Sequence, residues 1–270
     1  MNEWNAMSYE GKDTILRVVK NESDKFFAMV DNDAAWEAQT GAGTWEVRDI
    51  VAHIVDTTEA YFLAFDAARS HADFGQPHGL PGMAARANAQ ALSLRSEPRA
   101  ALVARLRGDL DKMMGIFDGL TEDDWGNLMV PHFYMGPLPA FFYPAFQVMD
   151  YGVHSWDVRQ GTGRSHGLPG AVGDVLVPFM FVLWKYTTTP ASEACEIGIR
   201  ITSGPNAGDT KVNVGPDGMS YEPGDVSNLA TVIEFDPGSF VLTAFGRSNS
   251  GSIRGDQAVA DRYLNLFFRI

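Results

Sequence analysis

The chain has 270 residues, of which 45% are hydrophobic and 20% charged. This is enough apolar material for a sizeable core, so wholesale disorder is excluded, and the length allows one large domain or two ordinary ones. The net charge of −13 gives a surface that repels phosphate backbones and anionic lipids, which excludes nucleic acid and membrane surfaces as expected partners. A single cysteine, Cys195, cannot form an internal disulfide, and the first residues do not resemble a signal peptide. These features predict a cytoplasmic protein.

Helical periodicity dominates the first two thirds of the chain. A Gly-rich break at Gly41-Ala42-Gly43 precedes the second helix, for which Thr44 is the expected N-cap. The segment from Trp125 to Pro139 is expected to be irregular because it contains several Pro and Gly residues. Long helices joined by modest loops predict an antiparallel four-helix bundle. The expected helices span about residues 12–32, 45–65, 98–117, 140–160 and 168–186.

The last third changes character. Alternating apolar residues predict strands at Cys195–Ile201 and at Leu229–Phe235, and Asp236-Pro237 is typical of a helix start. An amphipathic helix is expected from Gln257 to Phe268. The fold class expected for the whole chain is therefore α+β, with a helical domain at residues 1–190 and a small α+β domain at residues 191–270.

Asp150 and His154 lie one turn apart on the predicted helix 140–160, on the same face. A carboxylate oxygen and an imidazole nitrogen in this arrangement can share one divalent cation. The third ligand has to come from another helix, and His53, on a flank of small residues, is the natural candidate. Two histidines and one carboxylate leave coordination positions open, as a catalytic metal site requires. Asp157 follows at a spacing that lets it accept a hydrogen bond from the far ring nitrogen of His154.

The spacing by itself leaves a second interpretation open. Pairs of the form Asp-x-x-x-His are also common on helix surfaces, where they cap the helix or form ion pairs. Nothing in the spacing links this pair to His53, which lies far earlier in the chain.

Two motifs resemble those of a known family. The segment Trp45-Glu46-Val47-Arg48-Asp49-Ile50-Val51-Ala52-His53 resembles the first motif of the DinB-like metal-binding bundles, in which a tryptophan begins a helix and a histidine ends the signature. The segment from Met149 to Arg159 (MDYGVHSWDVR) is similar to the second motif, an acidic residue followed by His and then Asp. Within this group the chain resembles the mycothiol-dependent maleylpyruvate isomerase family over most of its length.

The resemblance implies a DinB-like bundle followed by a C-terminal domain related to sterol carrier proteins. It implies that His53, Asp150 and His154 bind a divalent metal, most simply Zn²⁺, and that mycothiol or a similar low-molecular-weight thiol is the co-substrate. Ala244-Phe245-Gly246-Arg247-Ser248 resembles the C-terminal Gly-Arg motif, whose arginine serves catalysis. Arg247 could equally be a cation that interacts with the dipole at a helix C-terminus. The isomerase has Glu where this chain has Asp150, so the resemblance implies metal binding but leaves the reaction itself open.

The function expected is that of a metal-dependent enzyme that uses a thiol to isomerise or S-conjugate a small electrophilic substrate. Two alternatives stay open from the sequence. One is a tailoring enzyme that keeps the metal but cyclises or rearranges a secondary metabolite without a thiol. The other is a non-enzymatic carrier that binds an apolar ligand in the C-terminal domain. The sequence does not indicate an oligomeric state.

Overall fold

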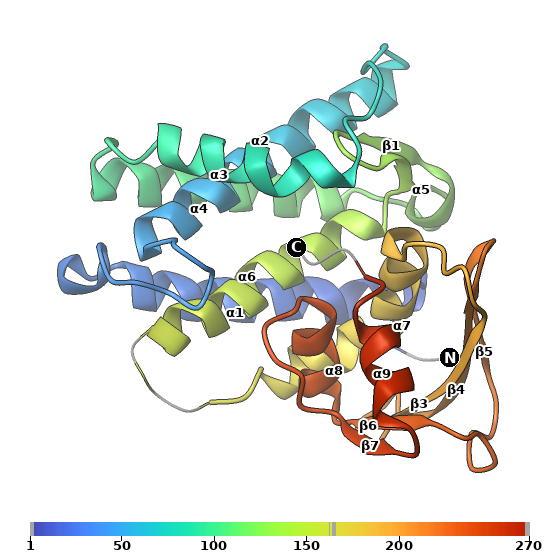
Figure 1. Ribbon diagram of the computed structural model, residues 1–270. Helices are drawn as coiled ribbons and strands as arrows, with labels where there is room; N and C mark the ends of the chain where they lie inside the picture. The colour runs from blue at the N-terminus through green and yellow to red at the C-terminus, as the bar shows by residue number, and fades with distance from the viewer. Residues whose placement is uncertain (1–2, 162, 164–165, 268–270) are drawn as a thin grey trace. The chain divides into compact units, whose positions relative to one another are not determined.

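The computed structural model describes residues 3–161, 163 and 166–267 (Figure 1). By its internal contacts the chain divides into a helical unit, Ala6–His166, and a second unit that runs from Gly167 onward and includes residues near the N-terminus. The first unit is mainly helical and the second contains a five-stranded sheet, so the predicted α+β fold is confirmed. The two units divide near residue 167, whereas the predicted domain border lies near residue 190.

The helical unit contains every α-helix predicted for residues before 161, together with elements that the sequence did not suggest. The additions are α3, which packs on α2, the short helix α5, and a two-stranded antiparallel hairpin, β1 with β2. The hairpin occupies the segment that was expected to be irregular. The bounds are α1 Lys12–Val30, α2 Val47–Ser70, α3 Met83–Ser93, α4 Arg99–Asp118, α5 Glu122–Asn127, β1 Met129–His132, β2 Gly136–Pro139 and α6 Phe142–Gly161.

Helix α6 runs through the middle of this unit (Figure 1). It packs against α1 and also contacts α2. From Phe142 to Val158 every side chain except that of Asp150 is buried. A helix that is apolar on nearly all sides has to be covered on all sides, which explains why the segment from 140 to 160 lacks a clear polar face. The one partly exposed side chain in this stretch belongs to Asp150, which the sequence analysis selected.

Helix α2 begins later than the sequence predicts. Its N-cap is Glu46 rather than Thr44, because Glu46 and Asp49 form a reciprocal capping box. The side chain of Asp49 accepts a hydrogen bond from the backbone N–H of Glu46, at 2.9 Å. This arrangement satisfies two N–H groups that would otherwise lack partners at the helix start. As a consequence Trp45 lies in the loop before the helix and not in its first turn.

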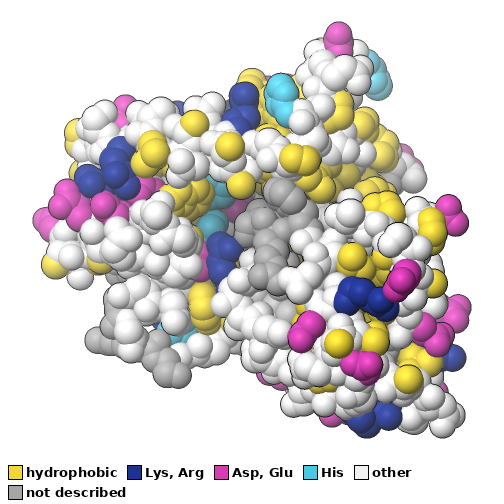
Figure 2. Space-filling view, in the orientation of Figure 1, with side chains coloured by type: hydrophobic (Ala, Val, Ile, Leu, Met, Phe, Trp, Pro, Cys, Tyr) yellow, Lys and Arg dark blue, Asp and Glu magenta, His cyan; other side chains and the backbone are white. Residues whose placement is uncertain are grey.

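Ion pairs join helix ends within the helical unit. At the end where α1 stops and α4 starts, Figure 2 shows acidic and basic side chains gathered together. Arg99 forms ion pairs with Asp31 at 2.7 Å and with Asp33 at 2.6 Å. These contacts lie at the surface, where a single pair contributes up to about 1 kcal/mol. They tie the start of α4 to the segment that follows α1.

The second unit is built on a mixed sheet with the strand order β5-β4-β3-β6-β7. Strands β3 and β6 are parallel, and the other neighbours are antiparallel. Helices α7, α8 and α9 pack against it (Figure 1). The predicted N-cap Asp236 accepts a hydrogen bond from the backbone N–H of Ser239. The bounds are α7 Gly170–Thr187, β3 Cys195–Ile201, β4 Gly208–Gly215, β5 Gly218–Pro223, β6 Val232–Phe235, α8 Pro237–Ala244, β7 Ser252–Arg254 and α9 Gln257–Leu264.

The predicted terminal helix is shorter than its pattern suggests. It ends at Leu264, and Phe268 lies outside the described residues. Gly255, with a φ of 103°, makes the turn into α9, and a Cβ there would meet the carbonyl oxygen of Ala230. Both constraints require glycine at this position. Among the described helices none is long and apolar enough to cross a membrane.

Candidate metal centre

Three side chains from two helices meet inside the helical unit. His53 of α2, Asp150 of α6 and His154 of α6 each present one potential ligand atom, and these atoms lie within 4.8 Å of one another. His154 is buried, while His53 and Asp150 are partly exposed. The imidazole rings of His53 and His154 are 5.3 Å apart between centroids and nearly perpendicular. The structure therefore brings together the three residues that the sequence analysis selected.

His154 is oriented by the residue one turn further along α6. Its Nδ1 atom lies 2.9 Å from Oδ2 of Asp157, which is fully buried. This contact is the one formed when Nδ1 carries the proton and donates it to the carboxylate, an arrangement that leaves Nε2 to act as a ligand. The hydrogen bond expected from the sequence is therefore present, and it selects the ring nitrogen that can bind a cation.

The loop before α2 is anchored to the end of α6. The backbone N–H of Gly41 donates to the carbonyl oxygen of Asp157 at 2.8 Å. At Gly161 a Cβ would lie 1.8 Å from the carbonyl oxygen of Gln39, so this close approach requires glycine. Together these contacts place residues 39–45 beside the two histidines.

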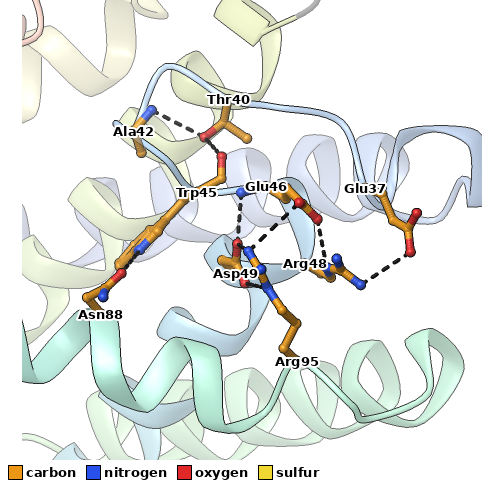
Figure 3. Close-up of polar contacts among 9 residues, drawn as sticks. All are labelled: Glu37, Thr40, Ala42, Trp45, Glu46, Arg48, Asp49, Asn88 and Arg95. Atoms are coloured by element: carbon orange, nitrogen blue, oxygen red, sulfur yellow. Dashed lines mark hydrogen bonds and ion pairs between the residues drawn. The ribbon is translucent and has the colours of Figure 1, made fainter.

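Trp45 forms one wall of the site. Its ring centroid lies 5.0 Å from that of His53 and 6.3 Å from that of His154. Figure 3 shows the indole extending from the loop towards α3, where Nε1 donates a hydrogen bond to Oδ1 of Asn88 at 2.9 Å. The carbonyl of Trp45 accepts from the backbone N–H and the hydroxyl of Thr40. The indole is thus fixed at both ends and covers the imidazole rings from one side.

Below Trp45, a network of charges fixes the start of α2 (Figure 3). Arg95 donates to both carboxylate oxygens of Asp49, which is fully buried. Burial acts to raise the pKa of Asp49, but the hydrogen bonds from Arg95 and from the backbone of Glu46 outweigh it, so the pKa is lowered. Asp49 is therefore ionised at neutral pH, and the pair joins α2 to the segment after α3. This network supports the wall that Trp45 provides.

The Asp150 carboxyl group is in a different electrostatic environment. Desolvation at its partly buried position raises its pKa to about 7, against an opposing contribution from His154. The amide Nε2 of Gln147 donates to Oδ2 of Asp150 at 3.4 Å and to Oγ1 of Thr58, on α2, at 3.2 Å. The pair of bonds connects the helix that carries His53 with the helix that carries the other two residues.

A second group of aromatic rings packs between α2, α6 and β1. The ring of Tyr61 lies 4.9 Å from that of Tyr143 and 6.1 Å from that of Phe146, and His132 of β1 lies 5.5 Å from Phe146. Burial lowers the pKa of His132 to about 4, so its imidazole is neutral at pH 7. The side chains packed in this part of the helical unit are therefore largely apolar and uncharged.

Arg247 belongs to the second unit. It follows α8, and its backbone N–H donates to the carbonyl of Leu242 at 2.9 Å, as expected after a helix end. Its Nη1 atom donates to the carbonyl oxygen of Phe245 at 3.3 Å, and the side chain is partly exposed. The role of Arg247 in catalysis stays a prediction.

Several residues around the site were not predicted from the sequence. Gln147 and Thr58 contact each other only because α2 and α6 pack together, and Asn88 lies on α3, which the pattern did not predict. One signal was available for Gln147, because a residue three positions before Asp150 lies on the same helix face.

The comparisons with known proteins agree with this architecture. Residues 16–159 match the family model described as the mycothiol maleylpyruvate isomerase N-terminal domain. The crystal structure of the mycothiol-dependent maleylpyruvate isomerase is similar at a TM-score of 0.60 and 13% identity, and the match covers 89% of this chain and 91% of that one. A histidine-to-alanine mutant of that enzyme matches at a TM-score of 0.60 and 12% identity, with the same coverage. No curated protein matches the chain. The chain belongs to the mycothiol maleylpyruvate isomerase N-terminal domain family.

Proposed function

We propose that this protein is a metal-dependent enzyme that uses a low-molecular-weight thiol, mycothiol or a close analogue, to isomerise or S-conjugate a small electrophilic substrate. One observation carries the proposal: ligand atoms of His53, Asp150 and His154 lie within 4.8 Å of one another. Membership of the family and the similarity in fold to the maleylpyruvate isomerase support the choice of thiol and reaction class.

The residues fit a divalent cation. Two imidazoles and one carboxylate are ligands that Zn²⁺ accepts, and three protein ligands leave room for a further one. The contact of Asp157 with Nδ1 of His154 supports the tautomer in which Nε2 is left to bind a cation. With a pKa of about 7, the Asp150 carboxyl group can release its proton to a cation near neutral pH. When bound, the cation supplies a Lewis acid that favours the thiolate form of a thiol at neutral pH.

The proposed reaction consists of addition of the thiolate to the substrate and, in an isomerase, its later elimination. The thiolate sulfur forms a bond to one carbon of an activated double bond, and the π-electron pair moves onto the conjugated carbonyl oxygen. In an isomerase the former double bond rotates, the electron pair returns and the C–S bond breaks, so that the thiol is recovered. In a transferase the adduct takes up a proton and persists. Arg247 is proposed to hold a carboxylate or the enolate oxygen, because a guanidinium offers paired donors to such groups.

Of the two alternatives, neither is favoured by a specific contact. A carrier needs an apolar chamber in the second unit, where Trp184, Phe240 and Tyr263 instead pack ring against ring. A thiol-free tailoring enzyme shares the metal site and differs only in its need for thiol.

The test measures metal and thiol binding directly. The purified wild-type protein should contain about one equivalent of divalent metal, and His53→Ala should lose both metal and turnover of maleylpyruvate with mycothiol. His78→Ala is the matched control, because it removes a histidine of the same unit that is not in the cluster. Mycothiol added to the Co²⁺-substituted protein should produce a sulfur-to-cobalt charge-transfer band. Metal-free protein that retains full turnover would contradict the metal proposal. Turnover that does not depend on thiol would favour the tailoring enzyme.

A further inference from the structure

Gln147 is fully buried in the helical unit, one turn before Asp150 on α6. Its amide nitrogen makes the two contacts described above, with Thr58 at 3.2 Å and Asp150 at 3.4 Å. The amide nitrogen is the donor in both contacts, and these two contacts together define the orientation of the amide.

That orientation leaves the amide oxygen without a partner. Oε1 of Gln147 is buried, and among the described residues none donates a hydrogen bond to it. A buried acceptor without a partner destabilises the folded state, typically by about 1–3 kcal/mol. An apolar side chain of the same length could fill this position without that cost. The contribution of Gln147 to stability therefore does not account for an amide at this position.

From these contacts we infer that Gln147 is a positioning residue for the metal centre, which fixes the Asp150 carboxylate in the direction of the two histidines. The inference rests on the proposed metal function. Thr58 holds the amide from the facing helix α2, so the carboxylate is aligned relative to the helix that carries His53 as well as to its own helix. Asp157 has the corresponding role for His154, which it contacts at 2.9 Å. Two of the three proposed ligands thus have a polar partner one turn away on α6.

The alignment matters because an aspartate side chain is short. Asp150 has two rotatable side-chain bonds, and its carboxylate is partly exposed, so without a partner it can turn towards water. A hydrogen bond from a buried amide that is itself fixed by Thr58 restricts this motion. A ligand that is already aligned loses less conformational entropy when the cation binds. Outer partners of this kind typically change metal affinity by about 10–100-fold.

The test replaces Gln147 with methionine, which has a similar length and no polar group. Tyr151→Phe is the matched control, because the hydroxyl of Tyr151 is also buried on α6 with no hydrogen-bond partner among the described residues. The ring of Tyr151 packs against Phe26 of α1, at 5.6 Å between centroids. For each variant two quantities are measured: the Kd for Zn²⁺ by competition with a chelator, and the Tm of the metal-free protein. The visible spectrum of the Co²⁺-substituted protein reports coordination geometry independently of activity.

We expect Gln147→Met to weaken Zn²⁺ binding by about 10–100-fold and to alter the Co²⁺ spectrum, with a Tm equal to or above that of the wild type. Tyr151→Phe should change neither the Kd nor the spectrum. Thr58→Val, which leaves Gln147 in place, should give a smaller loss of affinity, about threefold.

A lowered Tm for Gln147→Met with unchanged Zn²⁺ affinity would overturn the inference and assign Gln147 a structural role. If the wild type itself bound no metal, the proposed function and this inference would both be overturned. If the wild type bound metal and Gln147→Met bound it equally well, only the inference would fail.

Discussion

The helical unit and the second unit bury different kinds of side chain. In the helical unit the buried residues include Glu22, Asp49, Gln147, His154 and Asp157, and most of these lie around α2 and α6. In the second unit the polar residues that are buried, within the described part of the chain, are Thr187 and Thr231. Burying polar and titratable groups is costly unless each has a partner. Their concentration in one unit therefore marks it as the place where chemistry is proposed to occur, while the second unit has the composition of a packing core.

The largest effect that we expect from this difference between the units is a loss of stability in the second unit. Trp184 of α7 is fully buried and stacks on Phe267 at 4.4 Å, with the rings of Phe240 and Tyr263 at its edges. Replacing it with alanine should lower the free energy of unfolding of this unit by about 3–5 kcal/mol. Urea denaturation followed by circular dichroism measures the loss. The metal content of the helical unit should not change, and loss of metal in this variant would break the proposed separation of roles.

Arg247 is the residue through which the second unit would take part in catalysis. Arg247→Ala should lower kcat/KM by about 10²–10³-fold, the typical effect of removing one donor to a developing negative charge. Metal content should stay at the wild-type level, and Arg247→Lys should restore part of the rate. Steady-state kinetics and elemental analysis together make the measurement. Unchanged turnover in Arg247→Ala would show that the residue is only a cation at the end of α8.

We expect the stability of the helical unit to depend on pH differently from that of the second unit. His132, in the helical unit, is the residue at which we test this. Its pKa is lowered by burial to about 4, whereas an unfolded histidine titrates near 6.5. Between these values the unfolded chain binds a proton that the folded chain does not, so stability falls as the pH drops from about 6.5 to 4. The loss is at most about 3 kcal/mol.

His132→Asn is the variant for this measurement. An asparagine oxygen can still accept from the backbone N–H groups of Tyr134 and Met135, as Nδ1 of His132 does, but it does not titrate. Urea midpoints measured from pH 7 to pH 4 should fall less steeply for this variant than for the wild type. Identical slopes would contradict the assignment of His132 as an imidazole that is neutral in the folded protein near pH 7.

The smallest of these effects concerns Asp157, which is fully buried and contacts a proposed ligand without being one. Asp157→Asn keeps the shape and can still accept from Nδ1 of His154, but it removes the negative charge that increases the basicity of the imidazole. Zn²⁺ affinity should fall by about 10–100-fold, measured by chelator competition. Glu22, another buried carboxylate of the same unit, provides the comparison: Glu22→Gln should leave Zn²⁺ affinity unchanged. Equal Zn²⁺ affinities for Asp157→Asn and the wild type would contradict this role of Asp157. The proposed metal centre would then depend on its three ligands alone.

Much of the fold could be predicted because the long elements carry strong patterns. The helices α1, α2, α4, α6 and α7 follow from apolar periodicity, and strand β3 follows from its alternation. Helix α3 gave no such signal, since its only fully buried side chain is Ala91 and it is held through polar contacts such as that of Asn88 with Trp45. The β1–β2 hairpin was hidden by Pro131, Pro137 and Pro139, because prolines are normally poor strand formers that only an edge or short hairpin tolerates.

The candidate site could be predicted in part for a similar reason. Asp150 and His154 share a helix, so their spacing alone places them together. Pairing them with His53 needed the packing of α2 against α6, which spacing does not encode and which came from the resemblance to a family. The wall provided by Trp45 was missed because it depends on where α2 begins. Because Glu46 is the N-cap, Trp45 precedes the helix, and its indole packs against the imidazole of His53.

The most direct measurement is a crystal structure of the protein with its native metal, with diffraction data collected on both sides of the metal absorption edge. The account predicts one anomalous peak between His53, Asp150 and His154, at about 2.0–2.2 Å from an imidazole nitrogen of each histidine and from a carboxylate oxygen. After soaking with mycothiol a sulfur atom should appear at about 2.3 Å from the same peak. A fully occupied peak elsewhere in the molecule, or none in a protein that turns over its substrate, would contradict the account.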